Sequence, residues 1–153
     1  MILRIRNLRD LNAALAAGQS LIGADLSHAD LRNANLTGVD FASAILTQAD
    51  LSHADLSHAR FTYANLFGVN CIYAILISTD LRHTNLSSAK FFHANLSKAN
   101  LFGSNCTYAS FISANLRDAN LSDANFLYAN LSSTQLTGAT VSNTQGLDIS
   151  TQF

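Results

Sequence analysis

The 153-residue chain has no proline, no tryptophan and no glutamate, and only 12% of its residues are charged. An ordinary soluble domain has about 25% charged residues, and a helical one uses glutamate and lysine freely. A mostly helical fold is therefore not expected. The net charge of −1 gives no basic surface for nucleic acid. No apolar run reaches the length of a membrane-spanning helix.

Cysteine is also scarce, and the familiar catalytic motifs are missing. Cys71 and Cys106 are too few for a disulfide framework and lack C-x-x-C spacing, so we expect a reduced, cytoplasmic protein. The sequence contains no phosphate-binding loop, no dinucleotide-binding glycine motif, no nucleophile elbow and no H-E-x-x-H pair. We therefore predict that the chain is not an enzyme and holds no catalytic residues, cofactor or metal.

A five-residue repeat fills most of the chain. From Leu21 to Val141 every fifth residue is Leu, Phe, Cys or Val, and the residue two places earlier is usually Ala. A period of five fits neither an α-helix nor a flat strand. The apolar spacing is two, then three, so Ala and Leu share one side of an extended segment and the chain turns before the next pair. This pattern predicts a solenoid around a narrow apolar axis.

The repeat unit is A-[DN]-[LF]-x-x, as in Ala24–His28, Ala29–Asn33 and Ala34–Gly38. These units resemble the pentapeptide repeat family, and the resemblance covers roughly residues 19–143. It implies an all-β solenoid, a right-handed quadrilateral parallel β-helix with four units in each coil. Such a chain forms about six coils. The family is abundant in bacteria, especially cyanobacteria, and many of its members have no assigned activity.

On this grid, residues 20 apart stack in four core columns. One column is entirely Leu, while Phe fills parts of the other three. Cys71 and Cys106 each precede a Phe in their columns, which favours a packing role for both thiols. The predicted structural core contains Leu36, Leu56, Leu76, Leu96, Leu116, Leu136, Phe41, Phe61, Phe91 and Phe111.

The pattern divides the chain into an N-terminal cap (1–18), the β-helix (19–143) and a C-terminal cap or tail (144–153). A short helix is expected at about residues 7–17, with Asn7 as its N-cap and Gly18 at its stop. We expect its face of Leu8, Leu11 and Leu15 to cover the first coil, and residues 2–6 to add a short edge strand. The C-terminal segment has two possible roles, folding over the last coil or binding a second copy.

Titratable residues do not converge on the predicted grid. All five histidines stand in the last place of their units, on several sides of the rod, which argues against a metal or acid–base site. Asp40, Arg60 and Asp80 fall in one column and predict an exposed ion-pair ladder of little energetic weight.

The outer walls carry one unusual apolar run. Ile72, Phe92 and Ile112 each follow a core residue and are 20 apart, so they should stack on one wall beside Tyr73. Two interpretations stay open here, a stabilising cross-coil ladder and a partner-binding surface. On the second interpretation, these four residues bind a protein partner or a second copy. We expect no direct binding of nucleic acid, membrane or small molecules.

The leading functional hypothesis is a non-enzymatic structural or protein-interaction module that binds a macromolecular partner through flat β-helix walls. The alternative comes from the resemblance, because one branch of the family mimics duplex DNA, binds DNA gyrase and gives fluoroquinolone resistance. A mimic needs dense surface acid, since duplex DNA carries about one charge per 1.7 Å. Residues 19–80, the most acidic stretch, hold six Asp against two Arg. That balance favours the interaction module.

Overall fold

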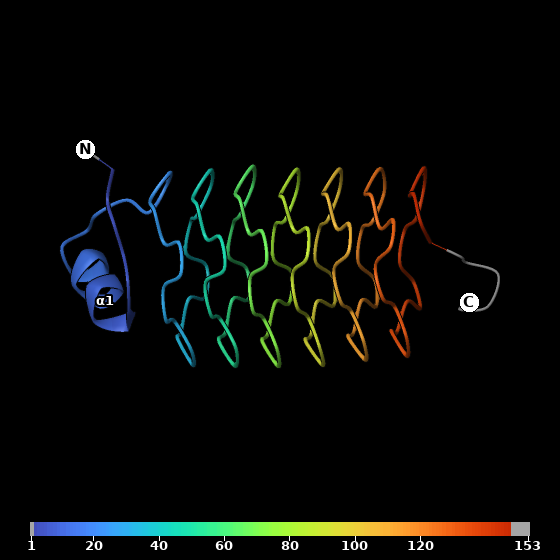
Figure 1. Ribbon diagram of the computed structural model, residues 1–153, viewed down its shortest axis with the longest axis horizontal. Helices are drawn as coiled ribbons and strands as arrows, with labels where there is room; N and C mark the ends of the chain where they lie inside the picture. The colour runs from blue at the N-terminus through green and yellow to red at the C-terminus, as the bar shows by residue number, and fades with distance from the viewer. Residues whose placement is uncertain (1, 148–153) are drawn as a thin grey trace.

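The structure is a computed structural model that describes residues 2–147. A single helix, α1 (Leu8–Ala16), stands at the N-terminal end of a rod of stacked coils (Figure 1). No second helix forms within residues 2–147, and none there is long and apolar enough to cross a membrane. The molecule is therefore a solenoid with one helical cap.

Parallel β-bridges connect residues 20 apart along the solenoid, from Asp25 with Ile45 to Asn125 with Gln145. This period confirms that four five-residue units make one coil. Each bridge is isolated, so the described walls contain single bridging residues instead of continuous strands. The predicted all-β solenoid agrees with this pairing between coils. The bridges stay isolated because the chain turns every five residues, which is too short for a regular strand.

The unit Ala54–His58 shows why the repeat folds this way. Ala54 and Leu56 are buried, whereas the Asp55 side chain between them points outward and accepts a hydrogen bond from the backbone N–H of Ser57, at 2.9 Å. The carbonyl of Leu56 accepts from the N–H of Ala59 at 3.0 Å. This Asx turn bends the chain toward the next wall. It explains why Asp or Asn stands between Ala and Leu, a reason that the repeat pattern alone does not reveal.

The last residue of nearly every described unit lies in the left-handed region of backbone space. His58, for example, has φ +60°, a conformation that costs a residue other than glycine roughly 1–2 kcal/mol. Its backbone N–H donates to the carbonyl of Ile77 on the next coil, at 2.9 Å. The bond between coils offsets part of the strain at the corner, so His, Ser, Asn and Tyr are accepted there.

The interior is an apolar column filled from all four walls. Phe41 stacks on Phe61 with ring centroids 5.0 Å apart, and Phe91 stacks on Phe111 at 4.9 Å. All of the residues assigned to the core from the sequence are buried, with at most 2% of their surface exposed: Leu36, Leu56, Leu76, Leu96, Leu116, Leu136, Phe41, Phe61, Phe91 and Phe111.

Both cysteines belong to this interior. Cys71 and Cys106 are buried, and neither forms a disulfide within the described part of the chain. Burial raises the pKa of both thiols, that of Cys106 to about 12. Thiols of this kind stay protonated at neutral pH and pack as small apolar groups.

The helix α1 closes the first coil. The side chain of Asn7 accepts from the backbone N–H of Asp10 at 3.0 Å, as an N-cap does, and Gly18 follows the helix with φ +66°. Leu11 is fully buried, whereas Leu8 and Leu15 are 37% and 38% exposed. The predicted apolar face is therefore misplaced, because only its centre reaches the coil and its two outer leucines lie at the edge.

Residues beside the helix extend the pairing of the coils. Ile5 donates to the carbonyl of Asp25 at 2.9 Å, Asp25 donates to Leu3 at 2.8 Å, and Arg4 forms a parallel bridge with Asp25. This is the short edge segment expected from the sequence. At the other end Leu147 packs against the core. The predicted cap or tail covers residues 144–153, and residues 148–153 of it lie outside the described part of the chain.

Candidate protein-binding surface

Ile72, Phe92 and Ile112 lie on consecutive coils of one wall, at the outward position that follows each core residue. The bridges of Asn70 with Lys90 and of Lys90 with Ser110 fix this register. All three side chains are half-buried, so they are less exposed than the sequence pattern suggests. They pack close to the wall, where neighbouring side chains cover part of each.

An aromatic stack covers part of this wall at the adjacent corner. Tyr73 lies between His53 and His93, with ring centroids 5.3 and 5.2 Å apart and nearly parallel planes. Phe92 makes T-shaped contacts with both Tyr73 and His93, with ring centroids 6.2 and 4.1 Å apart. Tyr73 itself remains 49% exposed. The stack therefore links the three coils and still presents aromatic surface to solvent.

The apolar surface continues around the corner onto the next wall. Ile75 is 40% exposed and Ile77 is half-buried there. Ile75 takes the place of the usual Asp or Asn, so the unit Ala74–Ser78 lacks the side-chain hydrogen bond that turns the units with Asp or Asn. The surface formed by Ile72, Tyr73, Ile75, Ile77, Phe92 and Ile112 is called the apolar corner below. Ile75 and Ile77 are not among the site residues predicted from the sequence, although the break in the consensus at Ile75 is a signal that could have found them.

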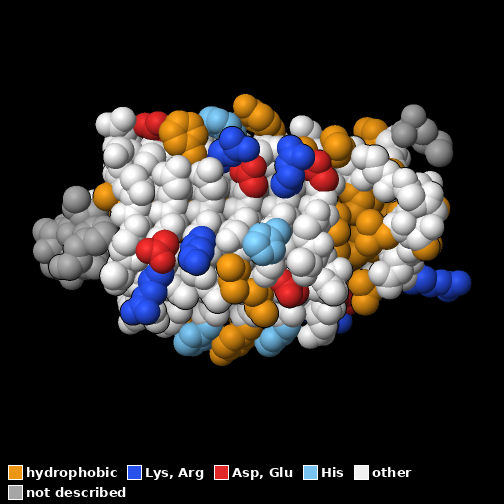
Figure 2. Space-filling model, turned by 180° about the vertical axis from the view of Figure 1, so that it is seen from behind, with side chains coloured by type: hydrophobic (Ala, Val, Ile, Leu, Met, Phe, Trp, Pro, Cys, Tyr) orange, Lys and Arg blue, Asp and Glu red, His pale blue; other side chains and the backbone are white. Residues whose placement is uncertain are grey.

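Aromatic stacking alone does not distinguish this corner. Tyr63 stacks on His83 at 5.1 Å, and Tyr108 stacks on Tyr128 at 4.9 Å, on two other corners. Figure 2 shows hydrophobic and histidine side chains along two long edges of the rod and also near the middle of the visible face, with Asp and Arg or Lys side chains scattered among neutral ones. The apolar corner combines such a stack with aliphatic side chains on both walls beside it.

Most of the acidic side chains near the solenoid's first half are bound to arginine. Arg32 contacts Asp30 at 2.7 Å, Arg60 contacts Asp40 at 3.1 Å and Arg82 contacts Asp80 at 2.7 Å. The ion-pair ladder predicted for Asp40, Arg60 and Asp80 is therefore only half correct. Arg60 joins Asp40 across one coil, whereas Asp80 binds Arg82, which is two residues away and reaches both of its carboxylate oxygens.

Asp50 and Lys90 differ from those pairs, because neither has an ion-pair partner among residues 2–147. Partial burial acts to raise the pKa of Asp50, but hydrogen bonds from Ser52 and Asn70 outweigh it and hold that pKa below its usual value. Asp50 therefore stays ionised well below neutral pH. Lys90 is exposed.

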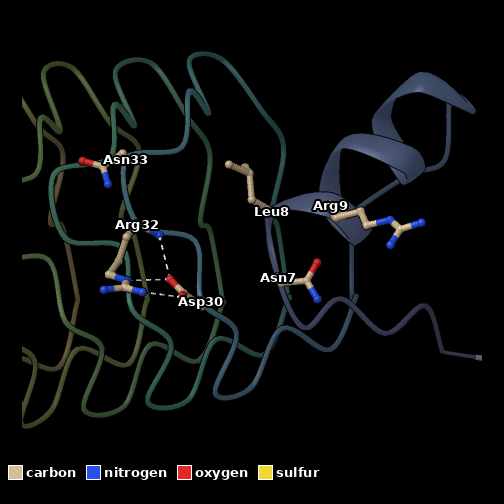
Figure 3. A pocket seen from close by; sticks show the side chains of 6 residues that line it. All are labelled: Asn7, Leu8, Arg9, Asp30, Arg32 and Asn33. Atoms are coloured by element: carbon tan, nitrogen blue, oxygen red, sulfur yellow. Dashed lines mark hydrogen bonds and ion pairs between the residues drawn. The ribbon is translucent and has the colours of Figure 1, made fainter.

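A shallow hollow of about 490 Å³ lies between the cap and the first coils (Figure 3). Asp30 is its single acidic residue, and both carboxylate oxygens bind Arg32, which lowers the pKa of Asp30 to about 2. Arg9 extends away from this pair (Figure 3). The acidic group of the hollow is therefore already bound by Arg32.

The histidines remain on separate corners, apart from the pair that sandwiches Tyr73. Among the described residues, no three His, Cys or Asp side chains gather closely enough to hold a metal ion. No buried side-chain nitrogen or oxygen in that part of the chain lacks a hydrogen-bond partner.

Comparison with known families gives a match over nearly the whole solenoid. The family described as pentapeptide repeats matches in 8 copies, over residues 10–48, 34–70, 64–103 and 104–143. No curated protein matches the chain.

Solved structures of similar proteins support the same fold. HetL, a pentapeptide repeat protein involved in heterocyst differentiation regulation in the cyanobacterium Nostoc sp. strain PCC 7120, is 23% identical, with a TM-score of 0.57 over 91% of this chain and 94% of its own. Rfr23 from the cyanobacterium Cyanothece 51142 is 27% identical, with a TM-score of 0.52 over 90% of this chain and 98% of its own.

A third structure, of the plasmid-mediated fluoroquinolone resistance protein QnrB1, is 18% identical, with a TM-score of 0.62 over 81% of this chain and 65% of its own. At the identities of HetL and QnrB1 the likeness concerns the fold alone. These neighbours imply the right-handed quadrilateral β-helix for the coils seen here. The repeat match and the 20-residue coil together show that this chain belongs to the pentapeptide repeat family.

Proposed function

We propose that the chain is a non-enzymatic interaction module in the cytoplasm, which docks a protein partner on the apolar corner. The observation that carries this proposal is Ile75. The Asp or Asn that the repeat prefers there would accept a backbone hydrogen bond, worth about 0.5–1.5 kcal/mol. The chain places an exposed apolar side chain in that position instead, next to an exposed Tyr73. A surface that forgoes a local hydrogen bond for exposed apolar area fits a role in binding.

The composition of the apolar corner supports the same function. Aromatic residues anchor protein interfaces, and an apolar centre inside a polar rim is their usual arrangement. Phe92 and Tyr73 are in edge contact at 6.2 Å and form the aromatic centre. Asp50 and Lys90 lie beside it on the same wall. The solenoid is well suited to hold such a surface rigid, because each coil is hydrogen-bonded to its neighbours.

The DNA-mimic alternative is less well supported by the surface charges. Asp25, Asp30, Asp40 and Asp80 are each bound to at least one arginine. These pairs reduce the negative potential that a gyrase-binding mimic needs. A supercoiling assay with DNA gyrase and the purified protein separates the two functions, and we expect no inhibition.

The proposed function is tested by replacing Phe92 with serine. Phe92→Ser should leave the fold intact and weaken association, measured by pull-down from the native host with the tagged wild type as reference. Phe67→Ser is the matched control, because Phe67 occupies the same place in its unit, on another wall, and is exposed. It should retain every partner. If Phe92→Ser lowers thermal stability but retains every partner, the wall is only a stabilising ladder and the proposal fails.

A further inference from the structure

The charges beside the apolar corner have opposite signs on its two sides. Asp50, Asn70 and Lys90 form consecutive bridges in one column, so the acid lies one coil before Asn70 and the base one coil after it. The two charges are separated by two coil spacings, about 10 Å. As shown above, neither has an ion-pair partner in residues 2–147. Both are thus available to an external charge.

The aromatic stack at the same level is symmetric about its centre. Tyr73 has a histidine on each side, His53 on the preceding coil and His93 on the following one, at 5.3 and 5.2 Å. Read along the rod in either direction, the corner presents imidazole, phenol, imidazole. In the adjacent column, reversing the direction leaves Asn70 at the centre and exchanges the positions of Asp50 and Lys90.

The charges and the stacked rings in this pattern are complementary to themselves. A two-fold axis perpendicular to the rod, at the level of Tyr73, reverses the order of the coils in the second molecule. It brings Asp50 opposite Lys90 of the second copy, and Lys90 opposite Asp50 of the second copy. Closed two-fold dimers are the commonest oligomers, and each of their contacts occurs twice.

We propose that the occupant of the apolar corner is a second copy of this chain, bound side by side and antiparallel around Tyr73. This inference rests on the proposed function, since it names the partner of the same surface. Charge complementarity favours the second copy over an unrelated protein. A parallel arrangement in register would place each charge opposite its own kind.

The size of the surface sets the strength of this dimer. Ile72 and Ile112 are two coil spacings apart, about 10 Å, whereas standard interfaces bury about 800 Å² on each partner. The surface is therefore small, and its dimer should be weak and concentration-dependent, with a dissociation constant in the micromolar range. Because Lys90 is exposed and Asp50 is only partly buried, high salt should weaken it further.

The first test is Lys90→Asp in the full chain. Aspartate is one of the two residues that the repeat prefers at this place, so the fold should be kept or stabilised. In the dimer, however, the new Asp faces Asp50 of the second copy, twice, and the dissociation constant should rise at least about tenfold. Sedimentation velocity over a concentration series measures it, with thermal melting as the check on folding. Lys98→Asp is the matched control, as another exposed lysine on a different corner, and should dimerise like the wild type.

The second test is a disulfide on the two-fold axis. Tyr73→Cys should form a covalent dimer under mild oxidation, because the two thiols meet at the axis. Tyr63→Cys is its control, since Tyr63 has a similar stack with His83 on another corner, and should remain monomeric. The native thiols are buried and do not interfere.

Several results would overturn this inference. They are a monomeric wild type at all concentrations, a dimer that Lys90→Asp leaves unchanged, or equal cross-linking from both tyrosine positions. A monomeric protein that still loses a host partner on Phe92→Ser would overturn the second copy alone and leave the proposed function standing.

Discussion

Two units on the same wall, one coil apart, show what the solenoid requires and what it leaves free. Leu56 and Leu76 are both fully buried and stack in the all-Leu column. Outside, the first unit has Asp55, whose carboxylate accepts from Ser57 at 2.9 Å, and the second has Ile75. The interior is thus identical while the exterior changes from a turn-forming acid to exposed apolar surface. The repeat constrains the inward positions strictly and the outward ones loosely. Outward residues that depart from the consensus are therefore the ones that can give each chain its own binding surface.

The largest effect is expected from disturbing the shared interior. Leu76→Asp buries an unpaired charge in a column of leucines, with no polar partner nearby, and should prevent folding. Ile77→Asp places the same charge on the adjacent outward position and should leave the fold intact. Circular dichroism and thermal melting compare the two variants. Equal damage from both would show that the assigned inward and outward register is wrong.

The inward positions are also those that the sequence predicts best. The two-then-three spacing of Ala74, Leu76 and Thr79 suffices to point them into the core, because it depends only on the geometry of an extended segment and a turn. The stop of the helix at Gly18 follows in the same way from local capping chemistry. The half-burial of Phe92 cannot be predicted in this way, because it depends on where the rings of Tyr73 and His93 lie.

Hydrogen-bonding roles were equally inaccessible to pattern analysis. The spacing shows that Asp55 lies between Ala and Leu, but not that its carboxylate closes the turn through the N–H of Ser57. The partner choice of Asp80 depends on a short-range rotamer of Arg82 rather than on the column it shares with Arg60. At Asp80 the contact within one unit therefore overrides the contact between coils, and the repeat grid does not rank the two.

Acid should be the next largest perturbation, because it removes the turn-forming carboxylates together. Hydrogen bonds from the backbone and side chain of Ser27 lower the pKa of Asp25 from 3.8 to about 2, and similar bonds from Ser57 lower that of Asp55. Each folded pKa lies below its unfolded value, so the stabilisation is fully present above about pH 5 and is lost as the pH falls through about 4 toward 2. Thermal melting from pH 7 to pH 2 should show this decline.

A variant separates the titration from the turn itself. Asp55→Asn keeps an oxygen that accepts from Ser57 but removes the titrating group, so it should be stable at neutral pH and show a shallower acid decline. An unchanged decline would mean that Asp55 does not contribute to the acid sensitivity.

A smaller effect is expected at the buried threonines, where the inner face departs from the consensus. Thr79 stands where most units have Ala, and its hydroxyl donates to the carbonyl of Leu56 on the preceding coil, at 2.9 Å. Thr79→Val keeps the shape and removes the donor, and should destabilise the fold by about 1 kcal/mol in urea unfolding. Ala59→Val, at the same place one coil earlier, is the control for added volume in this column. No measurable loss from Thr79→Val would mean that the bond is not stabilising.

The smallest change in stability, and the sharpest test of the comparison between the two units, comes from giving the second unit the exterior of the first. Ile75→Asn restores an acceptor for the N–H of Ile77, worth about 0.5–1.5 kcal/mol, and loses the partly buried surface of isoleucine, worth about the same. The free energy of unfolding should therefore change by less than about 1 kcal/mol. Association through the apolar corner should nevertheless weaken, because an exposed apolar contact is replaced by an amide that prefers water. Ile45→Asn, the same substitution at a similarly exposed isoleucine on another wall, should give the same small change in stability with no loss of association. If both variants associate like the wild type, Ile75 contributes only to the packing of the coil and does not contact a partner.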